Sequence, residues 1–135
     1  ESANRFRYSA SGKVGDLVDV VCEPERLRGL GGSGTVHHVA FSTNDDSSIV
    51  EMQERLASKG LSVTPVLDRQ YFHSIYFREP GGVLFEVATN PPGFAIDEPK
   101  DQLGQGLKLP AWEEPKRAQI EKGLAPISFD WKKFI

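Results

Sequence analysis

The chain has 135 residues, of which 39% are hydrophobic and 26% charged, the size and composition of a single globular domain. Its formal net charge of -3 excludes the strong positive field with which proteins hold nucleic acids or anionic membrane surfaces. Cys22 is the single cysteine, so no internal disulfide can form, and no apolar run reaches the roughly 18–20 residues of a membrane span. We therefore expect a cytoplasmic protein that binds neither nucleic acid nor membrane.

The first 34 residues are rich in glycine, serine and charge. They contain one apolar stretch, over residues 17–21, whose alternation predicts a short strand. The glycine-rich run over 29–34 is typical of a flexible connector, because glycine leaves the backbone many conformations. We expect residues 1–34 to form a segment and linker that precede the main module.

Residues 35–90 have the hydrophobic pattern of one compact module. β-branched and aromatic residues predict strands, and apolar residues with helical spacing predict one helix. The predicted order is β-α-β-β-β, with strands over 35–42, 61–67, 71–78 and 83–89 and a helix over 46–59.

Local sequence features indicate where these elements begin and end. The polar cluster over 44–48 favours a helix start, and Ser48 with Glu51 has the spacing of a capping box. Pro65 cannot donate to a sheet ladder, which favours an edge or bulged strand. The run over 79–82 predicts a tight turn, with a positive φ at Gly81.

Residues 91–135 are expected to form a tail, because proline is frequent at their start. A short helix is predicted where Glu113 and Glu114 precede Pro115, ending near Lys122 and Gly123. Its apolar face is thin, so we expect the tail to lie on the surface of a neighbouring module.

Side-chain parity predicts which residues share a face of the sheet, since alternate residues of a strand point to opposite sides. Ile75, Phe77 and Val87 fall on one face, and Tyr76 and Glu86 fall on the other. If the bulky face packs on the helix, the opposite face presents a phenol and a carboxylate, joined by His38 from the first strand.

Parity alone leaves simpler interpretations open. A glutamate in an antiparallel sheet commonly faces solvent, and a strand histidine is commonly a structural residue. Arg69 can be a solvated turn residue and Tyr76 an ordinary sheet aromatic. Neighbouring residues of a strand point apart, so at most one member of the His37-His38 pair can bind a given ion from this strand.

The β-α-β-β-β order, with a histidine on the first strand and a glutamate on the last, resembles the module of the vicinal oxygen chelate superfamily. This superfamily includes glyoxalases, bleomycin-resistance proteins and extradiol dioxygenases. Four motifs in particular resemble the C-terminal module of hydroquinone-type ring-cleaving dioxygenases: 34–41 (GTVHHVAF), 68–72 (DRQYF), 74–82 (SIYFREPGG) and 84–89 (LFEVAT). The resemblance also covers the ends, since residues 14–20 resemble the inter-module segment of that family and 91–94 through 107–110 resemble its tail.

The resemblance implies an α+β fold in which the module forms half of a metal-binding sheet cup, with an N-terminal linker and a C-terminal tail. It implies that Fe(II) is held by His38 and Glu86, and that His37, Arg69 and Tyr76 line the substrate pocket as catalytic residues. Tyr76 and His37 can exchange protons with substrate oxygens, and Arg69 can stabilise an anionic oxygen.

The third ligand of such a site, a histidine, comes from the first module of the family. His73 has the parity of Ile75 and Phe77 and is expected to be structural. The missing ligand must come from an N-terminal module or a second copy of the chain, and we expect the chain to be inactive alone.

The leading hypothesis is the C-terminal half of an Fe(II)-dependent dioxygenase that cleaves hydroquinone or catechol rings with O₂ during the degradation of aromatic compounds. Two alternatives remain at this stage. One is a glyoxalase-like isomerase or thiol transferase that uses Mn, Zn or Ni. The other is a non-catalytic module that binds a small molecule.

Overall fold

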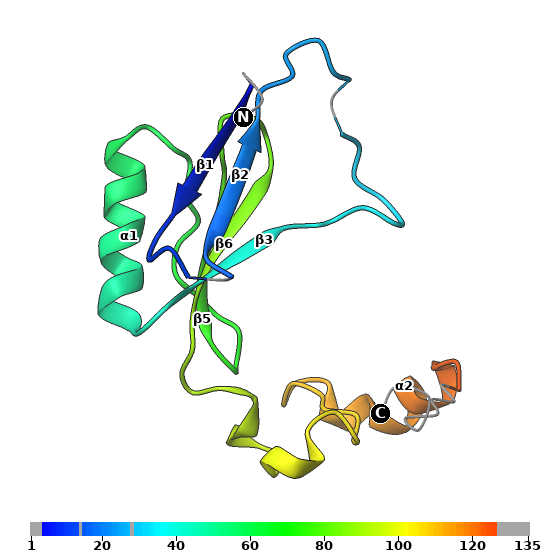
Figure 1. The fold of residues 1–135 in the computed structure, drawn as a ribbon. Coiled ribbons are helices and arrows are strands. Elements are labelled where there is room, and N and C mark those ends of the chain that lie inside the picture. Colours follow the sequence, from blue (N-terminus) through cyan, green and yellow to red (C-terminus); the bar gives the residue numbers. More distant parts are fainter. Residues whose placement is uncertain (1–3, 14, 28, 127–135) are drawn as a thin grey trace. The chain divides into compact units, whose positions relative to one another are not determined.

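The computed structural model describes residues 4–13, 15–27 and 29–126, and the chain divides into two compact units, one ending at His37 and one beginning at His38. Figure 1 labels the main elements. Parts of the predicted segments over 1–34 and 91–135, namely residues 1–3, 14, 28 and 127–135, lie outside the described residues. The predicted boundaries after residues 34 and 90 stay predictions.

The N-terminal unit contains an antiparallel hairpin of β1 (Arg5–Ser9) and β2 (Leu17–Val21). The strand predicted over 17–21 is confirmed, whereas β1 was not predicted. Arg7 and Asp19 lie opposite each other, and the Arg7 Nε donates to Asp19 Oδ1 at 2.7 Å. Arg5 also lies 3.5 Å from Asp19, so the one carboxylate of β2 pairs with both arginines of β1.

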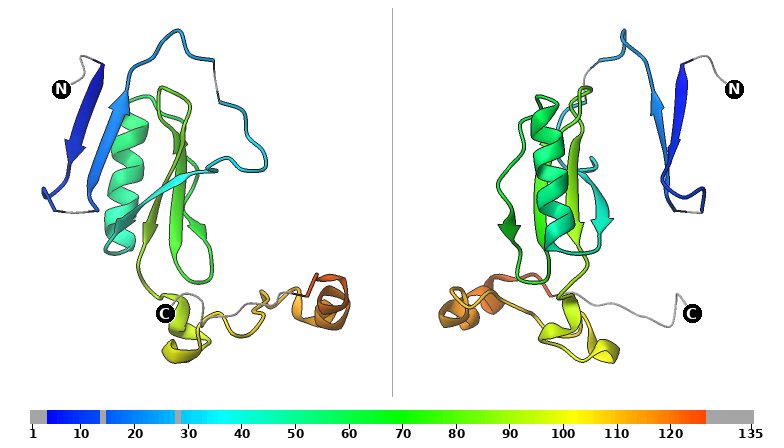
Figure 2. Two further views of the ribbon diagram at one scale, coloured as in Figure 1. Left: turned by 45° about the vertical axis from the view of Figure 1, so that its right-hand side comes forward. Right: turned by 90° about the vertical axis from the view of Figure 1, so that its left-hand side faces the viewer.

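The C-terminal unit confirms the predicted β-α-β-β-β order and the α+β class. Its elements are β3 (Val39–Thr43), α1 (Asp46–Ser58), β4 (Leu67–Asp68), β5 (His73–Arg78) and β6 (Leu84–Thr89). The sheet order is β3-β6-β5-β4, in which β3 runs parallel to β6 and the other pairs are antiparallel. Figure 2 shows α1 lying along one face of this sheet.

Helix α1 starts and ends close to the predicted bounds, but the capping box predicted from Ser48 and Glu51 is wrong. Asp45 is the N-cap, and its side chain accepts from the Ser48 backbone N–H at 2.8 Å. The hydrogen bonds that the Asp45 carboxylate accepts, above all the one from the Ser48 backbone N–H, lower the pKa of Asp45 to about 2. Lys59 is the C-cap, and Gly60 follows with a φ of +82°, as the Lys-Gly pair predicts.

Two strand predictions were too long. Residues 35–38 precede β3, and the strand predicted over 61–67 is reduced to an isolated bridge at Val63 and the two-residue β4 at the sheet edge. Pro65 lies between these two pieces, and its missing N–H explains why the ladder is interrupted there.

The turn between β5 and β6 closes through a hydrogen bond from Gly82 N–H to the Glu79 carbonyl at 2.8 Å. The positive φ, +94°, belongs to Gly82 and not to Gly81 as predicted. The Glu79 carboxylate caps the turn by accepting from the backbone N–H groups of Gly81 and Val83, each at 2.7 Å. This turn sets the register in which Tyr76 pairs with Glu86.

The core lies between α1 and the sheet. Ile49, Ile75 and Val87 are buried at its centre, and the partly buried residues that pack against them are Met52, Leu56, Val63, Val66 and Phe77. The apolar parity of β5 and β6 is therefore confirmed as the helix-covered face.

The tail contains three 3₁₀ turns, η1 (Phe94–Ile96), η2 (Lys100–Gln102) and η3 (Glu114–Lys116), and then α2 (Arg117–Gly123). The short helix predicted near residues 113–123 is confirmed. The first part of the tail contacts the turn between β4 and β5 of its own unit, because Gly93 N–H donates to the Tyr71 carbonyl at 2.8 Å. In the described part of the chain, no helix has the length and apolar character that a bilayer crossing requires.

Candidate active site

Glu86 lies in the middle of β6 and is only 3% exposed. It pairs with Tyr76 on β5 and with Ala40 on β3, so its side chain shares the sheet face opposite the apolar core. Burying a carboxylate is costly unless it finds hydrogen-bond donors or a cation. Each of its two oxygens has a polar partner.

Tyr76 is the first partner, and its hydroxyl donates to Glu86 Oε1 at 2.5 Å. Burial, and next the hydrogen bond to Glu86, raise the pKa of the Tyr76 phenol above its usual value near 10. The phenol therefore stays protonated near neutral pH and acts as a hydrogen-bond donor.

Two residues that the sequence did not single out hold the backbone of Tyr76. The Tyr76 N–H donates to Thr64 Oγ1 at 3.0 Å, and the Thr64 N–H donates to the Tyr76 carbonyl at 3.0 Å. Gln53 on α1 donates to the Thr64 carbonyl at 2.6 Å. The position of Thr64 next to Pro65 could have indicated this contact, because a polar residue beside a strand break often forms a hydrogen bond with the neighbouring backbone.

His38 is the second partner of Glu86. It comes one residue before β3, and its Nε2 lies 2.9 Å from Glu86 Oε2. The His38 side chain is 36% exposed, and its ring meets the Tyr76 ring edge to face at 6.2 Å between centroids. Three of the residues chosen from the sequence thus meet at one point.

Arg69 lies in the turn between β4 and β5 and is exposed. Its guanidinium carbon is 5.9 Å from the centre of the Tyr76 ring, within cation–π range. A permanent positive charge therefore lies on the rim of the His38–Tyr76–Glu86 cluster.

The other two histidines differ from His38. His37 is exposed and ends the N-terminal unit, so its role at the site stays a prediction. His73 Nδ1 lies 2.6 Å from Asp46 Oδ1 on α1, so His73 contacts the helix on the apolar side of the sheet. That contact agrees with the structural role expected from its parity.

His38 and Glu86 suit two positions of a divalent metal site. Imidazole and carboxylate are the donors of the two-histidine, one-carboxylate triad. His38 Nε2 and Glu86 Oε2 lie 2.9 Å apart, so one divalent cation could be held by both of them. The Tyr76 hydroxyl donates a hydrogen bond to the other oxygen of Glu86. Carboxylates that bind metals are commonly held by such a hydrogen bond.

Across residues 4–13, 15–27 and 29–126, no group of three or more His, Cys, Asp or Glu side chains could hold a metal ion. The cluster brings together an imidazole, a buried carboxylate, a phenol and a nearby guanidinium.

The sequence profile of the Glyoxalase/Bleomycin resistance protein/Dioxygenase superfamily matches residues 4–87. The chain belongs to this superfamily. Members of the superfamily include enzymes and binding proteins alike, so membership by itself leaves the reaction open.

Several relatives carry names of ring-cleaving enzymes. The chain is 51% identical over 121 residues to "Putative ring-cleaving dioxygenase MhqO" of Bacillus subtilis (strain 168), which covers 90% of the chain and 38% of the relative. It is 37% identical over 112 residues to "Chlorohydroquinone/hydroquinone 1,2-dioxygenase" of Sphingobium indicum, covering 78% of the chain and 34% of the relative.

The fold has a solved counterpart. A crystal structure of a protein described as a putative dioxygenase from Bacillus subtilis matches 95% of the chain at 48% identity, with a TM-score of 0.87. The chain covers 41% of that protein. It therefore spans well under half the length of the relatives it matches.

Proposed function

We propose that the chain is the C-terminal module of an Fe(II)-dependent dioxygenase that cleaves the rings of hydroquinones or catechols. The observation that carries the proposal is the 2.9 Å contact between His38 Nε2 and Glu86 Oε2 on a buried, phenol-bound carboxylate. The names of the relatives support this reaction over the others of the superfamily.

His38 and Glu86 would hold the metal, and a histidine from an N-terminal module or from a second copy of the chain would complete the triad. Iron supplies, when bound, a Lewis acid for a substrate oxygen and a centre that can activate O₂. Metal ligation requires an unprotonated imidazole nitrogen, which His38 Nε2 would supply.

The remaining residues act on the substrate and on the carboxylate. Tyr76 holds Glu86 Oε1 and fixes the orientation of Oε2. Arg69 supplies a positive charge that favours a phenolate over a neutral phenol. His37, if it faces the pocket, can take the proton that the substrate hydroxyl loses.

The test measures O₂ consumption by the full-length gene product that contains this chain, loaded with Fe(II) without air and mixed with hydroquinone or catechol. We expect stoichiometric O₂ uptake by that protein and none by the 135-residue chain alone. Bound iron without O₂ uptake on either substrate overturns the proposal. Turnover of another substrate without O₂, supported by Mn, Zn or Ni, supports the isomerase or transferase alternative instead.

A further inference from the structure

The turn between β4 and β5 carries Arg69 and has a strained backbone. Gln70 has a φ of +70°, which residues other than glycine rarely adopt. Arg69 N–H donates to the Phe72 carbonyl at 2.9 Å, and Gln70 N–H donates to Asp68 Oδ1 at 2.7 Å. A strained turn keeps its shape only where further contacts hold it.

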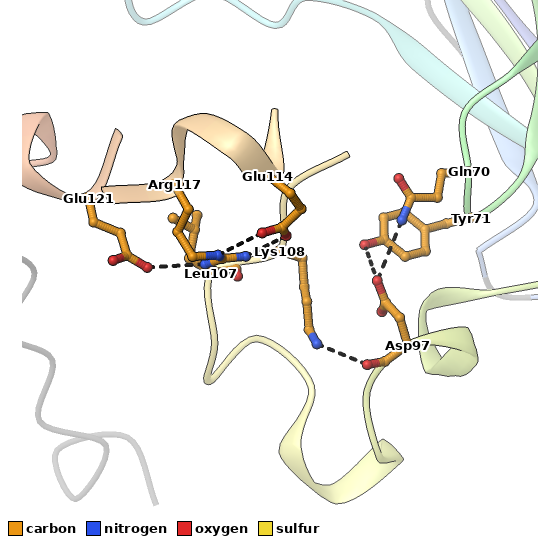
Figure 3. Close-up of polar contacts among 8 residues, drawn as sticks. All are labelled: Gln70, Tyr71, Asp97, Leu107, Lys108, Glu114, Arg117 and Glu121. Atoms are coloured by element: carbon orange, nitrogen blue, oxygen red, sulfur yellow. Dashed lines mark hydrogen bonds and ion pairs between the residues drawn. The ribbon is translucent and has the colours of Figure 1, made fainter. Parts of the chain in front are cut away.

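Those contacts come from the tail (Figure 3). The Tyr71 hydroxyl donates to Asp97 Oδ2 at 2.9 Å, and Gln70 Nε2 lies 3.5 Å from the same oxygen. The Tyr71 ring lies 4.9 Å from the Phe94 ring, centre to centre. The hydrogen bond to Asp97 also raises the pKa of the Tyr71 phenol, so the phenol remains a donor in neutral and mildly alkaline solution.

Asp97 is itself fixed by the later part of the tail. Lys108 Nζ donates to the Asp97 carbonyl at 2.9 Å. Arg117 donates to the Leu107 carbonyl at 3.1 Å and pairs with Glu114 at 2.6 Å and with Glu121 at 3.1 Å. Figure 3 shows these contacts linking α2, the 107–108 segment, Asp97 and the turn. The tail therefore braces the residue that holds Tyr71.

The turn connects the tail to the active site. Arg69 is the neighbour of Gln70, and its guanidinium lies over the ring of Tyr76, whose hydroxyl binds Glu86. A change of backbone conformation at Gln70 would move the base of the Arg69 side chain and the charge at its end.

We propose that Tyr71 and Asp97 are positioning residues that hold the turn over 68–72 and keep the Arg69 charge at the rim of the site. In this way the tail sets the affinity for a substrate with an anionic oxygen. The effect on substrate rests on the proposed function, whereas the effect on the turn stands independently of it.

The first test measures amide hydrogen exchange in the full-length protein. Tyr71→Phe removes the hydroxyl and keeps the ring, and Asp97→Ala removes the acceptor. We expect exchange at the Arg69 amide to accelerate roughly two- to tenfold, the range that the loss of one hydrogen bond allows. Glu113→Ala is the matched control, because it removes a local tail pair with Lys116 that is not among the contacts leading to Asp97, and it should leave this exchange unchanged.

The second test separates positioning from general stability. Hydroquinone affinity is measured by calorimetry without O₂, so turnover is not needed. Tyr71→Phe should weaken binding when Arg69 is present and have no further effect in an Arg69→Ala background. Additive losses would mean a merely structural role for Tyr71 and would overturn the positioning of Arg69.

Failure of this inference can be distinguished from failure of the proposed reaction. Unchanged exchange at the turn in both Tyr71→Phe and Asp97→Ala overturns the inference even if the enzyme consumes O₂. Accelerated exchange and non-additive binding in a protein that consumes no O₂ support the positioning role and reject the reaction. Lack of any hydroquinone binding by the unaltered protein overturns the link to substrate.

Discussion

The two faces of one sheet have opposite properties although the same strands form them. On β5, Ile75 is fully buried against α1, and the next residue, Tyr76, points to the other face and binds Glu86. On β6, Val87 belongs to the core and its neighbour Glu86 faces His38. Strand alternation therefore separates a face that stabilises the fold from a face that carries polar chemistry, and substitutions on each should have different consequences.

The largest expected effect on stability belongs to the apolar face. Ile75→Ala removes a fully buried side chain and should lower the free energy of unfolding by roughly 2–5 kcal/mol. The metal affinity of the protein that remains folded should not change. Urea unfolding followed by circular dichroism measures the first quantity, and calorimetric metal titration the second.

Val50→Ala is the matched control, because Val50 follows the buried Ile49 on α1 and is 43% exposed. It should change stability far less than Ile75→Ala does. Equal losses in the two variants would contradict the assignment of the core.

A smaller change in free energy is expected on the polar face. Tyr76→Phe keeps the ring but removes the hydroxyl that orients Glu86, so metal affinity of the full-length protein should fall about 10- to 100-fold. Stability should fall by about 1–3 kcal/mol, because one oxygen of a buried carboxylate loses its donor. Metal affinity equal to that of the unaltered protein would show that the phenol does not orient the ligand.

The smallest effect is expected where β5 meets the start of α1. The hydrogen bond that the His73 imidazole donates to the Asp46 carboxylate raises the pKa of His73, and Asp68 adds a weaker attraction. Since the folded-state pKa is the higher one, the stabilisation is complete below the unfolded value near 6.5 and is lost as pH rises through the folded value. Both side chains are partly exposed, so solvent screening keeps the effect small.

Urea unfolding at about pH 5.5 and about pH 8.5 checks this prediction. His73→Gln should be less stable than the unaltered protein at the lower pH and nearly equal at the higher one. Asp46→Asn should remove the same pH dependence. A difference that grows with pH would have the wrong sign.

The sequence predicted the elements of the C-terminal unit and the shared face of Tyr76 and Glu86, because both follow from local periodicity. The turn at Gly82 then aligns these two residues. The contact of His38 with Glu86 depends on the parallel register of β3 and β6, which no local pattern determines. Parity placed His38 on the same face as Tyr76 and Glu86, but only the resemblance to a family singled it out as a metal ligand.

Other features depended on choices among equivalent residues or on distant partners. Five polar residues over 44–48 could each cap α1, and only the folded backbone selects Asp45. β1 was missed because its arginines look solvated until Asp19 is placed opposite Arg7. The contact of Tyr71 with Asp97 joins residues 26 positions apart, across an irregular tail that has no periodic signal.

The central claim is that His38 and Glu86 are metal ligands, and the most direct measurement is Fe(II) binding without air. It compares the full-length protein with its His38→Ala, Glu86→Ala and His73→Ala variants, each first shown to be folded by circular dichroism. We predict that the unaltered protein and His73→Ala each bind one iron per site. The His38→Ala and Glu86→Ala variants should lose more than about 100-fold in affinity for Fe(II). Unchanged iron affinity in folded His38→Ala or Glu86→Ala would contradict the claim.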